Sequence, residues 1–153
     1  MSVDARLSDL GITLPVPPAP LAAYVGFVRT GNLVTTAGQL PTLEGKLLYG
    51  GKVGLDVSDE EAVRAARLCC INALAQLKAA AGSLDSIRRI VRLDGFVASV
   101  PGYTRQPAVL NGASELLLQV FGDIGRHART AVGVAELPLG ASVELALWAE
   151  IAP

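Results

Sequence analysis

The chain ends with Thr130-Ala-Val-Gly-Val-Ala-Glu136, then Leu137-Pro138-Leu139-Gly140, then Ser142-Val-Glu-Leu-Ala-Leu-Trp-Ala-Glu-Ile-Ala152. These stretches predict two β-strands in succession with a turn between them. In the second strand, apolar residues at every second position share one face: Val143, Leu145, Leu147, Ala149 and Ile151. A period of two is typical of a strand that buries one face in a core. The chain therefore ends in a sheet with one core-facing side.

Two amphipathic helices are predicted to cover this sheet. Ser58-Asp59-Glu60-Glu61 places a hydroxyl three residues ahead of a glutamate, the pattern of a capping box, so a helix should begin there. Apolar residues follow at spacings of three and four as far as Leu77, and Gly82 is well placed to end this helix. The stretch Gln106 to Phe121 predicts a second helix, with Pro107 tolerated in its first turn.

Three further strands are expected before these last two. Tyr24 to Arg29 and Leu33 to Ala37 are rich in β-branched and aromatic residues and predict a β-hairpin. Ile87 to Val100 predicts a strand, in which Gly95 is the candidate position for a bend. The resulting order is β-β-α-β-α-β-β, with both helices long enough to cover one side of a sheet. This order indicates a two-layer α+β domain.

Residues 1–153 are expected to form a single domain, since this length is typical of one domain. The segment 5–20 predicts a short helical turn followed by a proline-rich arm, and we expect the arm, residues 1–20, to pack on the body. The glycine-rich segment Thr42 to Gly54 predicts a loop or an irregular ribbon.

The composition indicates a folded, apolar protein with almost no net charge. Hydrophobic residues make up 51% of the chain and charged residues 18%, which excludes a disordered chain. A formal net charge of −1 argues against a broad electrostatic contact with nucleic acid or with an anionic membrane. Part of the apolar surface is expected to lie between subunits.

The N-terminal region predicts neither a membrane span nor a secretory signal. Leu10 to Val28 carries no charge, but a helix there is prevented by Pro15, Pro17, Pro18 and Pro20. The residues before it lack a basic start followed by an apolar run. A cytoplasmic location is therefore expected.

Most of the usual catalytic and metal-binding patterns are missing. With His127 as the single histidine, no multi-histidine metal site is expected. The adjacent Cys69 and Cys70 would point about 100° apart on a helix, so we expect two small buried hydrophobic residues and no intrachain disulfide. No serine-nucleophile elbow or phosphate-binding loop occurs. Neither a metal nor a cofactor is expected.

Two places could carry chemistry. The segment Gly125-Arg-His-Ala-Arg-Thr130 puts three potential cations at the entrance to an apolar strand, where a solvated loop explains the spacing about as well as an anion site. His127 by itself is more often a surface residue or a local hydrogen-bonding group than a catalyst. Glu144 lies inside an apolar strand, where a carboxylate needs a partner.

The stretch from Ala128 to Leu145 resembles the C-terminal signature of the Rid family, the reactive intermediate deaminases, also called YjgF or L-PSP endoribonuclease proteins. That signature is Arg-[Ser/Thr]-x-Val-x-Val-x-x-Leu-Pro followed shortly by a strand glutamate, and here it runs from Arg129 to Glu144.

The N-terminal pattern of the same family is also present, in the same order and spacing. Tyr24, Gly31-Asn32-Leu33 and Ala37-Gly38-Gln39-Leu40-Pro41 resemble the family's Tyr…Gly-Asn-Leu…Ser-Gly-Gln-[Ile/Leu]-Pro. Because two separated motifs agree, the resemblance is specific, and it covers about residues 21–152. The arm from Leu7 to Pro20 and the segment Gln106 to Gly112 suggest a longer branch of the family.

This resemblance implies a chorismate-mutase-like α+β subunit with a mixed sheet covered by two helices. It also implies a homotrimer with ligand sites in clefts between neighbouring subunits. Members of the family hydrolyse 2-imino or 2-enamino acids to 2-oxo acids and ammonia. A small-molecule carboxylate ligand is therefore expected.

The resemblance also implies roles for individual residues. Arg129 would bind the substrate carboxylate, because a planar guanidinium can form two parallel charge-assisted hydrogen bonds. Tyr24, Gly38 and Asn111 would line the cleft. Glu144 would position or deprotonate the water that adds to the imine carbon.

Two departures from the family pattern keep a second function open. The family's serine is Ala37 here, and the cysteine that many deaminases carry two residues after the arginine is Ala131. Both losses favour a non-catalytic trimeric protein that binds a carboxylate metabolite. A ribonuclease is the remote alternative, because the near-neutral charge and 5% aromatic content do not suggest a nucleic-acid surface.

Overall fold

The computed structural model describes residues 1–17, 19–20 and 22–153. Over these residues the helices are α1 (Val3–Asp9), α2 (Asp59–Ala81) and α3 (Gln106–Phe121). The strands are β1 (Phe27–Thr30), β2 (Leu33–Thr36), β3 (Thr42–Leu43), β4 (Lys46–Leu47), β5 (Ile87–Ala98), β6 (Ala128–Val134) and β7 (Val143–Ile151). Short 3-10 turns are η1 (Leu84–Ser86), η2 (Gly122–Gly125) and η3 (Pro138–Gly140). The expected order of long strands and helices is confirmed.

The main sheet is mixed and has the strand order β1-β2-β7-β5-β6. The strands β6 and β7 follow each other in sequence but do not pair, because β5 lies between them, parallel to β6 and antiparallel to β7. The expected hairpin is confirmed as β1 and β2, and the glycine-rich segment forms the small ribbon of β3 and β4.

The helix α2 begins and ends where its sequence indicated. The Ser58 hydroxyl accepts a hydrogen bond from the Glu61 N–H at 3.1 Å, and the Glu61 carboxylate accepts one from the Ser58 N–H at 2.9 Å. Both halves of the capping box are therefore present. Gly82 follows the last helical residue with φ at +77°, a conformation that glycine adopts at little cost.

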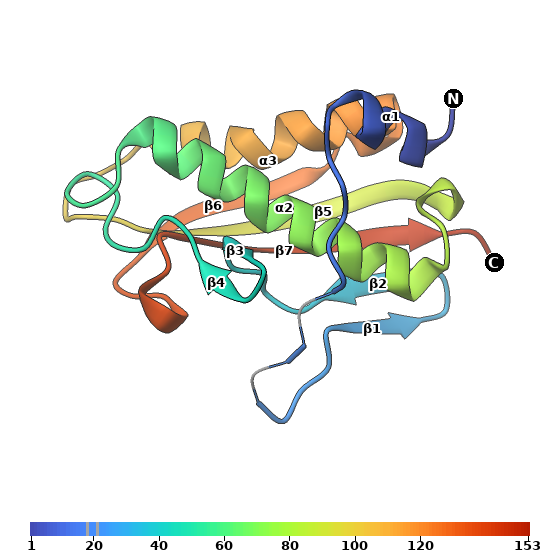
Figure 1. Ribbon diagram of the computed structural model, residues 1–153, viewed down its shortest axis with the longest axis horizontal. Helices are drawn as coiled ribbons and strands as arrows, with labels where there is room; N and C mark the ends of the chain where they lie inside the picture. The colour runs from blue at the N-terminus through green and yellow to red at the C-terminus, as the bar shows by residue number, and fades with distance from the viewer. Residues whose placement is uncertain (18, 21) are drawn as a thin grey trace.

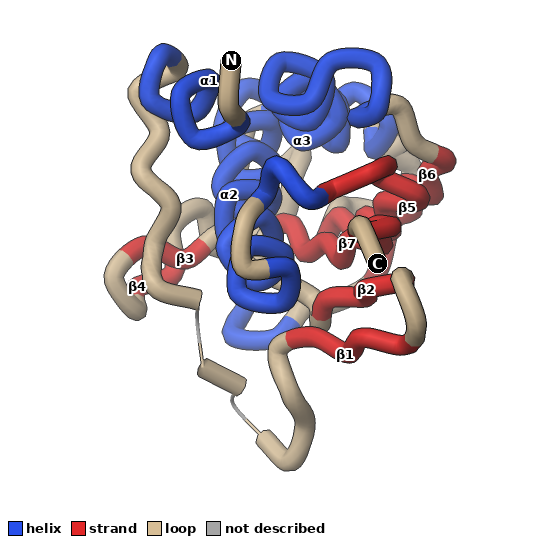
Figure 2. Tube along the Cα trace, turned by 90° about the vertical axis from the view of Figure 1, so that its right-hand side faces the viewer, coloured by secondary structure: helices blue, strands red, loops and turns tan. Residues whose placement is uncertain are grey.

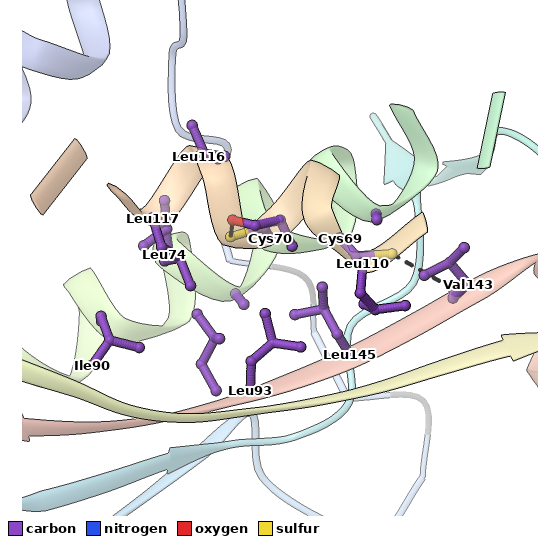
Figure 3. Close-up of a cluster of buried hydrophobic side chains, with 14 of the residues drawn as sticks. Cys69, Cys70, Leu74, Ile90, Leu93, Leu110, Leu116, Leu117, Val143 and Leu145 are labelled. Atoms are coloured by element: carbon purple, nitrogen blue, oxygen red, sulfur yellow. Dashed lines mark hydrogen bonds between the residues drawn. The ribbon is translucent and has the colours of Figure 1, made fainter. Parts of the chain in front are cut away.

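All three helices lie on one side of the main sheet (Figures 1 and 2). Between the layers, fully buried side chains from α2 and α3 meet those of β5 and β7; they include Leu74, Leu110, Leu116, Leu117, Ile90, Leu93 and Leu145 (Figure 3). Truncating one of these leucines to alanine would cost about 2–5 kcal/mol of stability. The two-layer α+β architecture with a mixed sheet is therefore confirmed.

The adjacent cysteines are part of this core. Cys69 and Cys70 are both free and fully buried, with their thiols near the carbonyls of Val143 and Ala113. Burial raises the pKa of both thiols, to about 12 for Cys70. The interpretation as small buried hydrophobic residues is confirmed.

Gly95, the candidate position for a bend in β5, has a packing role. The register of β5 against β7 is regular through Gly95, and its irregularities lie between Ile87 and Arg92. A Cβ on Gly95 would come within 2.4 Å of Leu110 Cδ1. A larger residue at this position would meet the fully buried Leu110 side chain of α3.

The N-terminal segment contributes residues to the core. Val3 and Leu7 of α1 are buried in it, and Ile12 and Leu14 pack against it. The backbone N–H of Val3 donates to Asp85 Oδ1 at 2.8 Å. Pro18, which belongs to the expected arm, lies outside the described residues.

The sheet face opposite the helices has no covering layer in the described chain (Figure 2). In β7 the residues on this face are half-buried up to Trp148, whose indole Nε1 donates to Asp94 Oδ2 at 3.2 Å. Arg92 pairs with the same carboxylate at 2.6 Å. Val132 on β6 is 40% exposed. This face thus carries large side chains without a second layer of structure.

Candidate functional site

Arg129 lies on β6 and reaches toward α3. Its Nη1 donates to Asn111 Oδ1 at 2.9 Å and to Ser114 Oγ at 3.1 Å, and its Nη2 donates to the Pro107 carbonyl at 3.3 Å. Asn111 and Ser114 are three residues apart on α3 and share one helix face. The helix therefore presents three oxygen acceptors to one guanidinium.

These contacts leave one edge of the guanidinium available. Both hydrogens of Nη1 are used, while Nε–H and one hydrogen of Nη2 have no acceptor in the described part of the chain. Nε and Nη2 form the side of the guanidinium that can donate two parallel hydrogen bonds to a carboxylate. The chain thus holds the Arg129 guanidinium in an orientation that leaves hydrogen-bond donors available for an anion.

His127 extends the same network. Its Nε2 lies 2.9 Å from Ser114 Oγ and its Nδ1 lies 2.7 Å from the Gly125 carbonyl oxygen. Burial lowers the pKa of His127, and the nearby Arg129 charge lowers it further, although the Gly125 hydrogen bond acts in the opposite direction. We call Asn111, Ser114, His127 and Arg129 the Arg129 cluster.

The rest of the basic segment faces solvent. Arg126 is exposed, and its Nε lies 3.4 Å from the Oδ1 of Asp123, which is exposed too. Of the two interpretations that the sequence left open for residues 125–130, the solvated loop describes Arg126, whereas His127 and Arg129 belong to the Arg129 cluster.

Glu144 lies on β7 in a different environment. It lines a pocket of about 740 Å³ together with Tyr24, Ala37, Gly38 and Gln39. The apolar part of the wall comes from the N-terminal arm, from β3 and from η3, and includes Leu14, Pro15, Val16, Leu43, Pro138 and Leu139. We call this the Glu144 pocket.

The Glu144 carboxylate has neither a hydrogen bond nor an ion pair within residues 1–17, 19–20 and 22–153. Burial raises its pKa above the ordinary value. A half-buried carboxylate without a partner costs free energy, as its place in an apolar strand suggested. The partner that the sequence called for therefore does not come from the described chain.

Gly38 and Tyr24 line the same pocket as Glu144. A Cβ on Gly38 would come within 2.0 Å of Glu144 Oε1, so only glycine allows the carboxylate to lie against this backbone. Tyr24 is 48% exposed and lines the same pocket. The structure thus brings together three of the expected site residues, Tyr24, Gly38 and Glu144.

Arg129 and Glu144 are not brought together within one chain. Arg129 pairs with Leu93 across β5 and β6, whereas Glu144 pairs with Phe96 across β5 and β7. Two strand spacings and three residues along the strand put their Cα atoms roughly 14 Å apart. Leu93 faces the helices and Phe96 the uncovered side, so the two side chains also leave opposite faces of the sheet. The expected site is divided into two halves, with Asn111 in the Arg129 half.

The two departures from the family pattern lie in different halves. Ala37 lines the Glu144 pocket, and Ala131 is two residues beyond Arg129, packed against the core. Neither side chain can donate or accept a hydrogen bond.

Sequence reasoning missed Ser114 and the apolar wall. The signal for Ser114 was its helical spacing from Asn111. Leu139 had no such signal: it is 68% exposed, and its φ of +59° is unusual for a leucine. Within the described residues no helix is both long and apolar enough to cross a membrane, and no group of three His, Cys, Asp or Glu side chains could hold a metal ion.

Comparison with known proteins gives close matches over nearly the whole chain. Residues 4–151 match the family described as “YjgF/chorismate_mutase-like, putative endoribonuclease”. Protein TCP17 of Trypanosoma cruzi is 45% identical over 150 residues, covering 97% of this chain and 94% of that protein.

Two solved structures agree with this match. The crystal structure of Atu1372 from Agrobacterium tumefaciens, described as of unknown function, is 52% identical, with a TM-score of 0.92 over 98% of this chain and 92% of the other. A crystal structure from Shewanella oneidensis MR-1, described as a “putative endoribonuclease”, is 39% identical, with a TM-score of 0.96 over 99% of this chain and 100% of the other.

Proposed function

The chain belongs to the YjgF/chorismate-mutase-like family, as its two sequence patterns predicted, and from this membership we propose that it hydrolyses 2-imino or 2-enamino acids to 2-oxo acids and ammonia. The observation that carries the proposal is the Arg129 guanidinium. Three acceptors of its own chain hold it, and the Nε edge stays available for a carboxylate.

The active unit in this proposal is a homotrimer with sites between subunits. The separation of Arg129 from Glu144 within one chain supports it, because one half offers a guanidinium for the carboxylate and the other offers the carboxylate for proton transfer, and the reaction needs both. The uncovered sheet face supports it as well, since large side chains there need a second layer. Light scattering at micromolar concentration should give three times the mass of one chain, and a stable monomer would contradict the shared site.

The reaction needs only orientation and proton transfer. The substrate carboxylate pairs with Arg129, which fixes the plane of the adjacent C=N bond. The substrate reacts as the protonated imine: the Glu144 carboxylate takes a proton from water while the water oxygen bonds to the imine carbon, and the electron pair of the C=N bond moves to nitrogen to give the neutral amine of a carbinolamine. Glu144 then gives its proton to that nitrogen. Ammonia leaves as the C=O bond forms, and the hydroxyl proton passes back to the Glu144 carboxylate and from there to solvent. A raised pKa suits Glu144 to both transfers.

The apolar wall of the Glu144 pocket favours substrates with a large apolar side chain. A volume of about 740 Å³ far exceeds the needs of the smallest imino acid, and the wall offers mainly hydrocarbon from Leu14, Val16 and Leu139. The expected order of kcat/KM is therefore leucine- or phenylalanine-derived imino acids above those derived from alanine.

A non-catalytic carboxylate-binding protein is the second candidate, favoured by Ala37 and Ala131. Neither half of the site has a hydroxyl or thiol at these positions to assist proton transfer. A ribonuclease, the activity in the family description, is placed last because of the net charge of −1.

One experiment separates these functions. Imino acids are generated in place by an amino-acid oxidase, and ammonia release is followed with and without the protein, beside titration of the corresponding 2-oxo acids. Accelerated release that rises with apolar side-chain size supports the deaminase. Binding of 2-oxo acids without any acceleration would replace it by the binding protein, and cleavage of an RNA substrate by the same preparation would point to the ribonuclease.

A further inference from the structure

The hydrogen bonds of the Arg129 cluster have a defined direction. A carbonyl oxygen can only accept, so His127 Nδ1 carries a hydrogen and donates it to Gly125 O at 2.7 Å. In the neutral ring Nε2 then has no hydrogen and accepts one from the Ser114 hydroxyl at 2.9 Å. The remaining lone pairs of Ser114 Oγ face Arg129, whose Nη1 donates at 3.1 Å.

This chain of donors ends on a fixed point of the backbone. Gly125 is buried, and a Cβ there would come within 2.4 Å of the Leu117 carbonyl oxygen, so η2 lies directly against α3. Each hydrogen bond also polarises the next, because the Ser114 hydroxyl becomes a stronger acceptor when it donates to imidazole.

Asn111 alone would leave the orientation of the Arg129 guanidinium less well defined. It accepts one hydrogen of Nη1, and Ser114 accepts the other. With both hydrogens occupied, rotation of the guanidinium would break two bonds to α3. The free Nε edge is then the edge that stays exposed.

We propose that Ser114 and His127 are positioning residues that hold Arg129 with its Nε edge directed to the carboxylate of the ligand. This inference extends the proposed function, since it assumes that Arg129 binds a carboxylate. Neither residue touches the reacting atoms. Their contribution is to affinity for a carboxylate, with little effect on the chemical step.

The first test needs no ligand. Nitrogen-15 NMR of the intact protein at pH 8 should show His127 as the neutral tautomer protonated on Nδ1. The Arg129 guanidinium should rotate slowly about its Nε–Cζ bond in the wild type and faster in Ser114→Ala. The Nε2-protonated tautomer, or identical rotation rates in the two proteins, would overturn the proposal.

The second test measures affinity for 4-methyl-2-oxopentanoate, a 2-oxo acid with an apolar side chain. Ser114→Ala removes an acceptor from a charged donor and should weaken binding about fivefold to twentyfold, with kcat for the corresponding imino acid within about twofold. Ser114→Thr keeps the hydroxyl and should bind within about twofold of the wild type.

A double-mutant cycle separates positioning from a general structural role. In the Arg129→Lys background there is no guanidinium to hold, so Ser114→Ala should have no further effect on affinity. An equal loss of affinity in both backgrounds, or full affinity of Ser114→Ala, would overturn the proposal. If the wild type binds no 2-oxo acid, the proposed function fails, whereas the NMR result still decides the positioning.

Discussion

The Arg129 cluster and the Glu144 pocket differ in how far their polar groups are satisfied by the chain itself. Arg129 has three acceptors and its neighbours are joined in a chain of hydrogen bonds. Glu144 has no partner among the described residues and faces a largely apolar wall. One half is organised before a ligand arrives, and the other keeps a reactive group in an environment that raises its pKa. In the proposed function, binding and proton transfer therefore belong to separate halves.

The largest expected effect is on the half that transfers protons. Glu144→Gln keeps the shape of the side chain but removes the proton acceptor, so kcat should fall about 10²- to 10⁴-fold while affinity for a 2-oxo acid changes little. Parallel ammonia-release and titration measurements check this. A fall in kcat below about threefold would remove Glu144 from the mechanism.

The next effect concerns the half that binds. Arg129→Lys should lose almost as much kcat/KM as Arg129→Ala. Lysine lacks the planar guanidinium that can hydrogen-bond to Asn111 and Ser114 while donating two parallel hydrogen bonds to a carboxylate. The loss in kcat/KM should be on the order of 2–4 kcal/mol, or tens- to nearly a thousand-fold. If the lysine variant kept most of its activity, Arg129 would act only as a nearby positive charge.

A smaller effect is expected from the backbone that supports Glu144. Gly38→Ala places a Cβ where Glu144 Oε1 now lies, so the carboxylate must move. Turnover should fall about tenfold, with less change in affinity for a 2-oxo acid. Gly31→Ala, at a hairpin turn away from both halves, controls for the stability cost of replacing a glycine, since its φ of +59° strains an alanine while nothing lies within 4 Å of the added Cβ. Equal turnover of the two variants would contradict the role of Gly38.

The smallest effect is on stability against acid. Because the pKa of His127 is lowered in the folded protein, its contribution to stability is complete above the unfolded pKa of about 6.5 and is lost as the pH falls through the folded value. Urea unfolding between pH 8 and pH 5 should therefore show a steeper loss for the wild type than for His127→Gln. Parallel curves for the two proteins would mean that His127 titrates alike in the folded and unfolded states.

The fold could be predicted largely because local rules determine it. The capping box at Ser58, the apolar stripe of α2 and the alternation of β7 depend on residues close together in the sequence. The position of β5 between β6 and β7 could not be derived in this way, because strand order depends on how distant segments pair.

The candidate site was predictable residue by residue but not as an arrangement. The family resemblance indicated Arg129, Glu144, Tyr24, Gly38 and Asn111. Their division into two halves appears only in three dimensions, since it depends on which sheet face each strand residue occupies. The role of His127 also required the structure, because Ser114 is the residue that connects it to Arg129.

Mixing two inactive variants tests the shared site most directly. Subunits carrying Arg129→Ala and subunits carrying Glu144→Gln are prepared with different tags and assembled together at equal amounts. If each site takes Arg129 from one subunit and Glu144 from its neighbour, about a quarter of the sites in randomly mixed trimers recover both residues. Ammonia release should then return to about a quarter of the wild-type rate. A mixture that assembles but stays as inactive as its two components would contradict the account.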